Sequence, residues 1–210
     1  MERFGFVGLP NAGKSSLYNA LAGGGALAAP YAFATTDPNE GVARVPDNRL
    51  SLLGEMSDSQ KIVSATIQFT DIGGLVEGAA KGEGLGNRFL AGIREVDAIV
   101  FVLRAFSDND VPGPTDPVEH LRIVEVELAL ADLETTQKQL LKIEKAAKSD
   151  KSIGQILDSL KHASEQLDQG IPIYKSDLTS SERELLSDFF LLTDKPVSVS
   201  YTHLTLPTKA

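Results

Sequence analysis

The chain contains no cysteine among its 210 residues. Disulfide bonds, thiolate metal sites and cysteine nucleophiles are therefore excluded, and the composition agrees with a cytoplasmic location. No apolar run approaches the roughly 20 residues that a helix needs to cross a bilayer. The N-terminus enters a strand-like segment directly, without a basic region and a cleavage site, so we expect no export signal and no membrane partner.

Positive charge is also scarce. Lysine and arginine number 20 against 29 acidic residues, which gives a formal net charge of −9. This balance argues against a protein that coats nucleic acid non-specifically, and we expect no DNA partner. A local basic patch stays open, and its candidate members share one helical face: Lys138, Lys142, Lys145 and Lys148. We favour the alternative that this is a solvated face, paired with Glu134 and Glu144 at helical spacing.

The most informative segment is residues 8–15, Gly-Leu-Pro-Asn-Ala-Gly-Lys-Ser, which matches G-x-x-x-x-G-K-[ST] at every fixed position. In this pattern backbone N–H groups cradle phosphate oxygens, and the following helix adds the positive end of its dipole. Lys14 supplies a point charge to the outer phosphates, and the Ser15 hydroxyl is a ligand for Mg2+. The predicted nucleotide-binding residues are Asn11, Ala12, Gly13, Lys14, Ser15 and Ser16.

The surroundings of this motif fit a nucleotide-binding α/β domain. A short apolar run at 3–7 predicts a strand before the loop, and residues 15–22 predict the start of a helix after it. Further strands are predicted at 41–45, 62–71 and 98–103, the last as an inner parallel strand. The predicted fold class is therefore α/β, a P-loop NTPase domain with a mostly parallel sheet and helices on both faces.

The pattern changes to helices from Asp116 onward. Apolar residues at helical spacing predict one long helix over 118–147 and a second over 153–167. Thr179-Ser-Ser-Glu182 is a capping-box signature for a third helix to about residue 192, before a strand at 195–199. We therefore divide the chain into a first part of the nucleotide domain (1–115), an inserted helical arm (116–192) and a return to the domain (193–200).

A second phosphate-sensing motif follows the third predicted strand. Asp71-Ile-Gly-Gly74 fits D-x-x-G, in which the aspartate reaches Mg2+ through a water and the Gly74 N–H responds to the γ-phosphate. The glycine-rich stretch 78–86 is either an ordinary surface loop or a mobile switch, and we favour the switch. Between the two motifs, Thr35 or Thr36 is expected to complete the metal shell when a triphosphate is bound.

Five stretches together resemble the YchF/Ola1 family, a branch of the Obg-related class of P-loop GTPases. They are residues 8–15, Phe33-Ala-Thr-Thr-Asp-Pro-Asn39, Asp71-Ile-Gly-Gly-Leu-Val76, Lys81-Gly-Glu-Gly-Leu-Gly-Asn87 and Glu127-Leu-Ala-Leu-Ala-Asp-Leu133. The resemblance runs from residue 1 to about 199. It implies that Thr35 is the Mg2+ ligand and that the helical arm is a coiled coil. It also implies hydrolysis of ATP in preference to GTP, association with the 50S or 70S ribosome, and a switch role in translation or redox control.

Three positions bear on turnover. Leu75 stands where Ras-like switches place a glutamine that orients the attacking water, so slow intrinsic hydrolysis is expected. Many relatives carry a histidine near residues 111–113, where this chain has Pro112-Gly113. Asn11 occupies the loop position that some related GTPases use to hold K+, so a K+ requirement is a hypothesis.

The chain departs from the family after residue 200. The base-specificity motif N-x-x-E is expected near position 202, but residues 201–210 read Tyr-Thr-His-Leu-Thr-Leu-Pro-Thr-Lys-Ala. We likewise expect no match to the family's C-terminal TGS domain within these 210 residues. We therefore expect residues 201–210 to be a non-native or disordered tail, with a divergent natural terminus as the alternative. Weakened triphosphate binding, poor discrimination between ATP and GTP, and an unprotected sheet edge are expected to follow.

The sequence thus predicts a Mg2+-dependent NTPase acting as a conformational switch. Lys14 and Gly74 are its expected catalytic residues, and Ser15, Thr35 and Asp71 its expected metal ligands. The alternative is a nucleotide-gated module that binds RNA or protein through the helical arm with negligible hydrolysis. The sequence predicts no oligomeric state.

Overall fold

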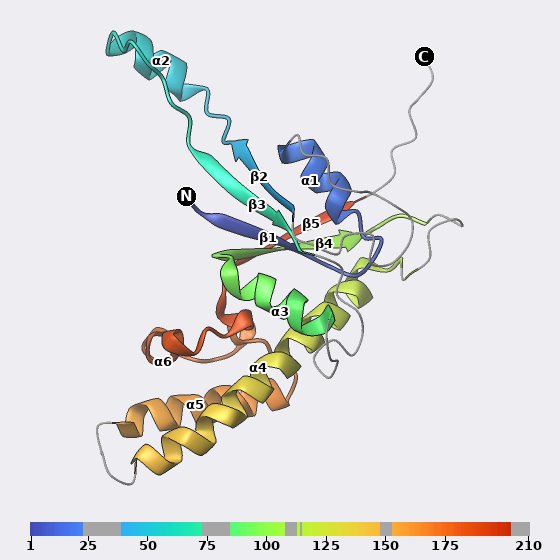
Figure 1. The fold of residues 1–210 in the computed structure, drawn as a ribbon, viewed down its shortest axis with the longest axis vertical. Coiled ribbons are helices and arrows are strands. Elements are labelled where there is room, and N and C mark those ends of the chain that lie inside the picture. Colours follow the sequence, from blue (N-terminus) through green and yellow to red (C-terminus); the bar gives the residue numbers. More distant parts are fainter. Residues whose placement is uncertain (23–38, 73–84, 108–112, 114, 148–152, 203–210) are drawn as a thin grey trace.

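A computed structural model describes residues 1–22, 39–72, 85–107, 113, 115–147 and 153–202 (Figure 1). The strands are β1 (Arg3–Val7), β2 (Asn39–Arg44), β3 (Thr66–Asp71), β4 (Ala98–Arg104) and β5 (Val197–Thr202). The helices are α1 (Lys14–Ala22), α2 (Arg49–Met56), α3 (Leu85–Glu95), α4 (Pro117–Ala147), α5 (Gly154–Asp168) and α6 (Ser180–Leu186). The short 3-10 turn η3 (Ile173–Lys175) lies between α5 and α6, and two more, η4 (Ser187–Phe189) and η5 (Leu192–Asp194), lie between α6 and β5.

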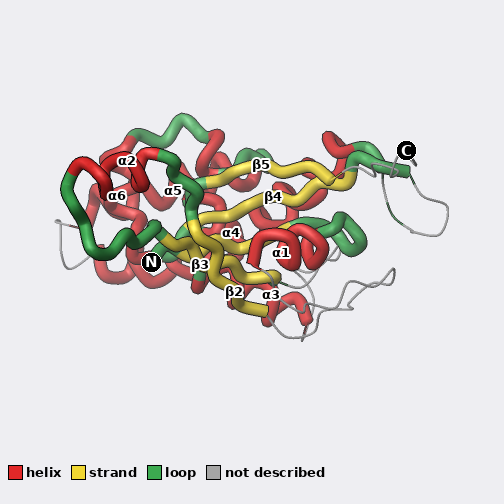
Figure 2. Tube along the Cα trace, turned by 90° about the horizontal axis from the view of Figure 1, so that it is seen from above, coloured by secondary structure: helices red, strands yellow, loops and turns green. Residues whose placement is uncertain are grey.

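The five strands form one sheet in the order β2-β3-β1-β4-β5, and Figure 2 labels β2, β3, β4 and β5 of it. Strand β1 lies in the middle, parallel to both β3 and β4, and β5 is parallel to β4. Only β2 runs antiparallel, as the neighbour of β3. The α/β class with a mostly parallel sheet is therefore confirmed.

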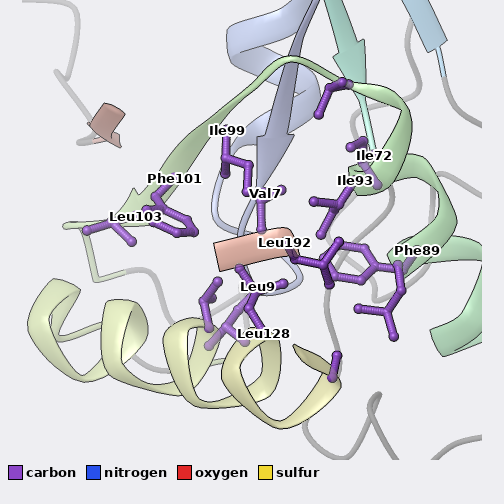
Figure 3. Packing of buried hydrophobic residues seen from close by; sticks show 14 residues of the cluster. Val7, Leu9, Ile72, Phe89, Ile93, Ile99, Phe101, Leu103, Leu128 and Leu192 are labelled. Carbon is purple, nitrogen blue, oxygen red and sulfur yellow. The ribbon is translucent and has the colours of Figure 1, made fainter. Parts of the chain in front are cut away.

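Helices cover both faces of this sheet because residues of the inner strands alternate between them. Phe6 of β1 points to one face and packs with Tyr18 of α1. Val7 and Phe101 point to the other face, where they join Leu128 of α4 in a large core cluster (Figure 3). Each large apolar side chain buried in this way contributes about 1.5–3 kcal/mol to folding.

The long helix α4 belongs to the sheet at one end and to a helical arm at the other. Leu128 and Val124 pack in the core beneath the sheet, whereas Ala129 joins Leu160 and Ala163 of α5 in a second cluster. Figure 1 shows α4 and α5 side by side, extending away from the sheet. None of the helices in the described ranges has both the length and the apolar character needed to cross a membrane. The coiled-coil character of the arm and the division into 1–115, 116–192 and 193–200 stay predictions.

A buried carboxylate fastens the returning segment to α4. Asp132 is 1% exposed and accepts hydrogen bonds from the backbone N–H of Leu192 at 2.8 Å and of Thr193 at 2.7 Å. The Thr193 hydroxyl donates a third at 2.7 Å. Because β5 follows directly, these bonds set where the chain re-enters the sheet.

Several predicted boundaries require correction. The capping box at Thr179 is present, but α6 ends at Leu186 rather than near 192, and Phe190 has a left-handed φ of 51° that prevents helical continuation. Strand β3 begins at Thr66 rather than at 62. Strand β5 includes Tyr201 and Thr202 of the predicted tail, because its pairing continues beside Leu103 and Arg104 of β4. Residues 203–210 lie outside the described residues.

The predicted solvated face on α4 is supported at one position. The Lys138 ammonium forms an ion pair with Glu134 one turn earlier, and both side chains are more than half exposed. Lys142 and Lys145 are exposed on the same helix, and Lys148 lies outside the described residues.

Candidate functional site

The phosphate loop connects β1 to α1 at the carboxyl ends of the parallel strands, where open α/β sheets bind their ligands. Two glycines allow its path. A Cβ atom on Gly8 would lie 2.4 Å from the carbonyl oxygen of Val102 in β4, so only glycine lets the loop approach this strand. Gly13 has a φ of 92° and Asn11 a φ of 62°, both in the left-handed region.

Lys14 folds back over the loop that precedes it. Lys14 as a residue is 7% exposed, and its ammonium donates to the carbonyl oxygens of Gly8 at 3.2 Å and Leu9 at 3.0 Å. Burial lowers the pKa of Lys14 to about 8, and the negative charge of Asp71 opposes this shift. The group is thus mostly charged at neutral pH and sits at the loop that is predicted to cradle phosphates.

Ser15 and Asp71 meet beside this ammonium. The Ser15 hydroxyl donates to Oδ2 of Asp71 at 2.6 Å, and the carboxylate is fully buried. The other oxygen, Oδ1, is buried and has no hydrogen-bond partner among the described residues. Burial raises the pKa of Asp71, while the Ser15 hydrogen bond and the Lys14 charge lower it.

These groups fit a magnesium ion. Mg2+ prefers oxygen ligands, keeps several waters and uses one or two protein groups together with substrate phosphates. A hydroxyl in contact with a buried carboxylate, with one carboxylate oxygen unsatisfied, supplies that kind of partial shell. Among the described residues, no group of three or more histidine, aspartate or glutamate side chains could hold a metal ion.

One residue at this site escaped the sequence analysis. His120, in the first turn of α4, is 1% exposed, and its Nε2 accepts a hydrogen bond from the Leu9 N–H at 2.7 Å. Its Nδ1 faces the N–H of Arg104 at 3.1 Å. Burial, together with the charges of Lys14 and Arg104, lowers the pKa of His120 to about 4, so the ring is neutral. A lone histidine in a predicted helix gives no signal in the sequence for this contact.

The structure brings together only part of the predicted site. Asn11, Ala12, Gly13, Lys14, Ser15 and Ser16 form the loop and the first turn of α1, and Asp71 lies beside them. Thr35, Thr36, Gly74 and Leu75 lie outside the described residues, as do residues 78–84 of the predicted switch. The roles of all these residues stay predictions.

Comparison with known proteins agrees with this arrangement. The model of a family described as 50S ribosome-binding GTPase matches residues 3–171. The chain is 44% identical over 197 residues to the ribosome-binding ATPase YchF of Bacillus subtilis, covering 92% of this chain and 54% of that protein. It is 43% identical over 196 residues to the protein of the same name from Haemophilus ducreyi, with 91% and 54% covered.

A solved structure is similar as well. The YchF GTPase of Schizosaccharomyces pombe superposes with a TM-score of 0.77 at 34% identity, over 96% of this chain and 56% of that one. The resemblance to the YchF/Ola1 family that the motifs indicate is thereby confirmed. The chain spans about half the length of the curated relatives it matches.

Proposed function

The chain belongs to the family of 50S ribosome-binding GTPases, and on that premise we propose that it binds and hydrolyses a Mg2+-bound nucleoside triphosphate as a ribosome-associated switch. The observation that supports this most strongly is the convergence of the Lys14 ammonium with the Ser15–Asp71 pair at one edge of the sheet. A charged donor for phosphate and oxygen ligands for a metal are thus already in place.

Each group has a distinct task in this proposal. Two of the three N–H donors of Lys14 bind loop carbonyls, which fixes the ammonium where the outer phosphates would lie. The first turn of α1 begins at Lys14 and directs its N–H groups toward the same place. Bound Mg2+ would neutralise charge on the phosphate oxygens, with Ser15 as a direct ligand and Asp71 acting through a water.

Hydrolysis transfers the γ-phosphoryl group to water and breaks the bond between the β- and γ-phosphates. The protein contributes by positioning and by electrostatic stabilisation rather than by covalent chemistry. Thr35 and Gly74 are proposed to close over the γ-phosphate on the basis of the family resemblance. Leu75 cannot orient the attacking water by a hydrogen bond, so slow turnover without a partner is proposed.

ATP is the proposed preferred nucleotide, because the curated bacterial relatives are named ATPases. Titration of the chain with ATP and with GTP tests the proposed preference. An affinity for GTP ten or more times higher than that for ATP would contradict it.

Ribosomes are the proposed partner, and the cytoplasm the proposed location. The experiment is phosphate release with and without 50S and 70S particles, in K+ and in Na+. Stimulation by ribosomes supports the switch, whereas no stimulation and no K+ effect favours the nucleotide-gated module. Equal rates in Na+ and K+ would remove the proposed K+ site at Asn11. A redox role could not use a thiol of this chain, which has no cysteine.

A further inference from the structure

His120, in the first turn of α4, connects this helix to the phosphate loop through a single peptide group. The N–H of Leu9 donates to the His120 ring at 2.7 Å. The carbonyl of the same peptide group, which belongs to Gly8, accepts from the Lys14 ammonium at 3.2 Å. Since N–H and C=O point in opposite directions across a trans peptide, this group is held at both ends.

We propose that His120 is a positioning residue for nucleotide binding, which holds the Gly8–Leu9 peptide so that its carbonyl stays on the Lys14 ammonium. The proposal rests on the proposed triphosphate site. It assigns a role in that site to a residue at the sheet end of α4, 111 residues from Leu9 in the sequence.

The chemistry of the ring defines which contact matters. A neutral imidazole has one acceptor nitrogen, so the contacts to Leu9 and Arg104 cannot both be hydrogen bonds in one tautomer. The Leu9 N–H lies 2.7 Å from Nε2 and the Arg104 N–H lies 3.1 Å from Nδ1, so we assign Nε2 as the acceptor on the shorter distance. The burial and the two neighbouring cations that keep the ring neutral also preserve this acceptor.

The surroundings fix the ring in place. Arg104 is 1% exposed, its Nε donates to the carbonyl of Phe106 at 3.1 Å, and its guanidinium lies 4.6 Å from the centre of the Phe106 ring. Residues from the loop, the end of β4 and the start of α4 thus surround His120. A shift of the first turn of α4 would therefore move the acceptor of the Leu9 N–H.

Two substitutions separate positioning from packing. In His120→Gln the amide oxygen lies about where Nε2 was and still accepts from Leu9. In His120→Asn the oxygen lies about where Nδ1 was, so it reaches Arg104 but not Leu9. His162→Asn on α5 is the control, because that ring contacts Asp177 and Glu182 of the arm rather than the loop.

The experiment combines calorimetric titration of Mg·ATP with amide hydrogen exchange of Leu9 in the nucleotide-free protein. We expect His120→Asn to weaken Mg·ATP binding about 5- to 10-fold and to speed Leu9 exchange, because it leaves the N–H without its acceptor. His120→Gln and His162→Asn should stay within about twofold of wild type in affinity. Unfolding temperatures of all variants show whether any of them has lost its fold. Leu160→Ala is a second control, because it destabilises the packing of α4 against α5 and leaves the contact between His120 and Leu9 intact.

Equal affinity and equal Leu9 protection in the Asn and Gln variants would overturn the positioning role. Equal weakening by Asn and Leu160→Ala would overturn it too, because general destabilisation would then explain the loss. No heat from the wild-type protein would instead overturn the proposed function, and with it any role of His120 in binding. In that case the Leu9 exchange rates would still show whether His120 accepts the Leu9 N–H, separately from whether the site binds nucleotide.

Discussion

The Ser15 hydroxyl lies 2.6 Å from Oδ2 of Asp71, although 56 residues separate them in the sequence. This hydrogen bond links the two motifs that the sequence identifies independently, one at the end of β1 and the other at the end of β3. Parallel strands β1 and β3 are neighbours, so their carboxyl ends bring the two side chains to the same edge. The order of the strands in the sheet, and not only the two local motifs, therefore brings Ser15 and Asp71 together.

Replacing Ser15 tests the metal role of this pair. Ser15→Ala removes the hydroxyl ligand and the hydrogen bond on Asp71. We therefore expect the increase in ATP affinity that Mg2+ produces to become smaller by about tenfold or more. Ser15→Thr keeps a hydroxyl and should retain the Mg2+ dependence. Titrations of ATP at several Mg2+ concentrations provide the measurement. An unchanged Mg2+ dependence in Ser15→Ala would argue against a metal at this site.

Nucleotide affinity should fall as the pH rises through the pKa of Lys14. Burial places this pKa at about 8 in the nucleotide-free protein, and phosphate charges favour the protonated form. Below pH 8 the ammonium is already charged. Above it, binding must first take up a proton, so affinity for Mg·ATP should drop by up to about tenfold per pH unit. Calorimetry in buffers of different ionisation enthalpy measures the proton uptake, and flat affinity from pH 7 to about 9.5 would contradict this assignment.

Position 8 should tolerate no side chain, because the loop passes very close to β4 there. In Gly8→Ala the new Cβ would meet the Val102 carbonyl oxygen at 2.4 Å, which requires a backbone shift. We expect a loss of about 2–3 kcal/mol in the free energy of unfolding. Gly154→Ala is the matched control, because nothing lies within 4 Å of its added Cβ in α5. That change should be neutral or stabilise by up to about 1 kcal/mol. Chemical denaturation compares the two.

Asp132 should be essential for the stability of the returning segment. Asp132→Ala removes the acceptor for two backbone N–H groups and one hydroxyl in a buried place, at an expected cost of about 3 kcal/mol. Glu134→Ala, two residues away on the exposed side of α4, should cost less than about 0.5 kcal/mol. Similar losses in both variants, measured by urea denaturation, would show that Asp132 does not anchor β5.

The sequence predicted the features that short motifs and periodicity determine. The phosphate loop and Asp71 are identified by residue types at fixed spacing, and α4 by a long apolar period without glycine or proline. The capping box at Thr179 was likewise predictable from the sequence, because its two residues, Thr179 and Glu182, lie within four positions of each other.

Features that depend on distant contacts could not be predicted in this way. The direction of β2 is antiparallel, but alternation within a strand does not reveal how its neighbour runs. The end of α6 at Leu186 depends on how the following 3-10 turns pack. His120 contacts a residue 111 positions away, so nothing near it in the sequence marks it as part of the site.

We propose that backbone amides of the loop and the Lys14 ammonium bind a magnesium-bound polyphosphate. The decisive experiment is calorimetric titration of the folded chain with Mg·ATP, beside Lys14→Ala. The account predicts saturable heat with the wild-type protein and about 10- to 100-fold weaker binding in the variant, the loss expected for a hydrogen bond from a charged donor. Identical binding curves for both proteins, or no heat with either ATP or GTP, would contradict it.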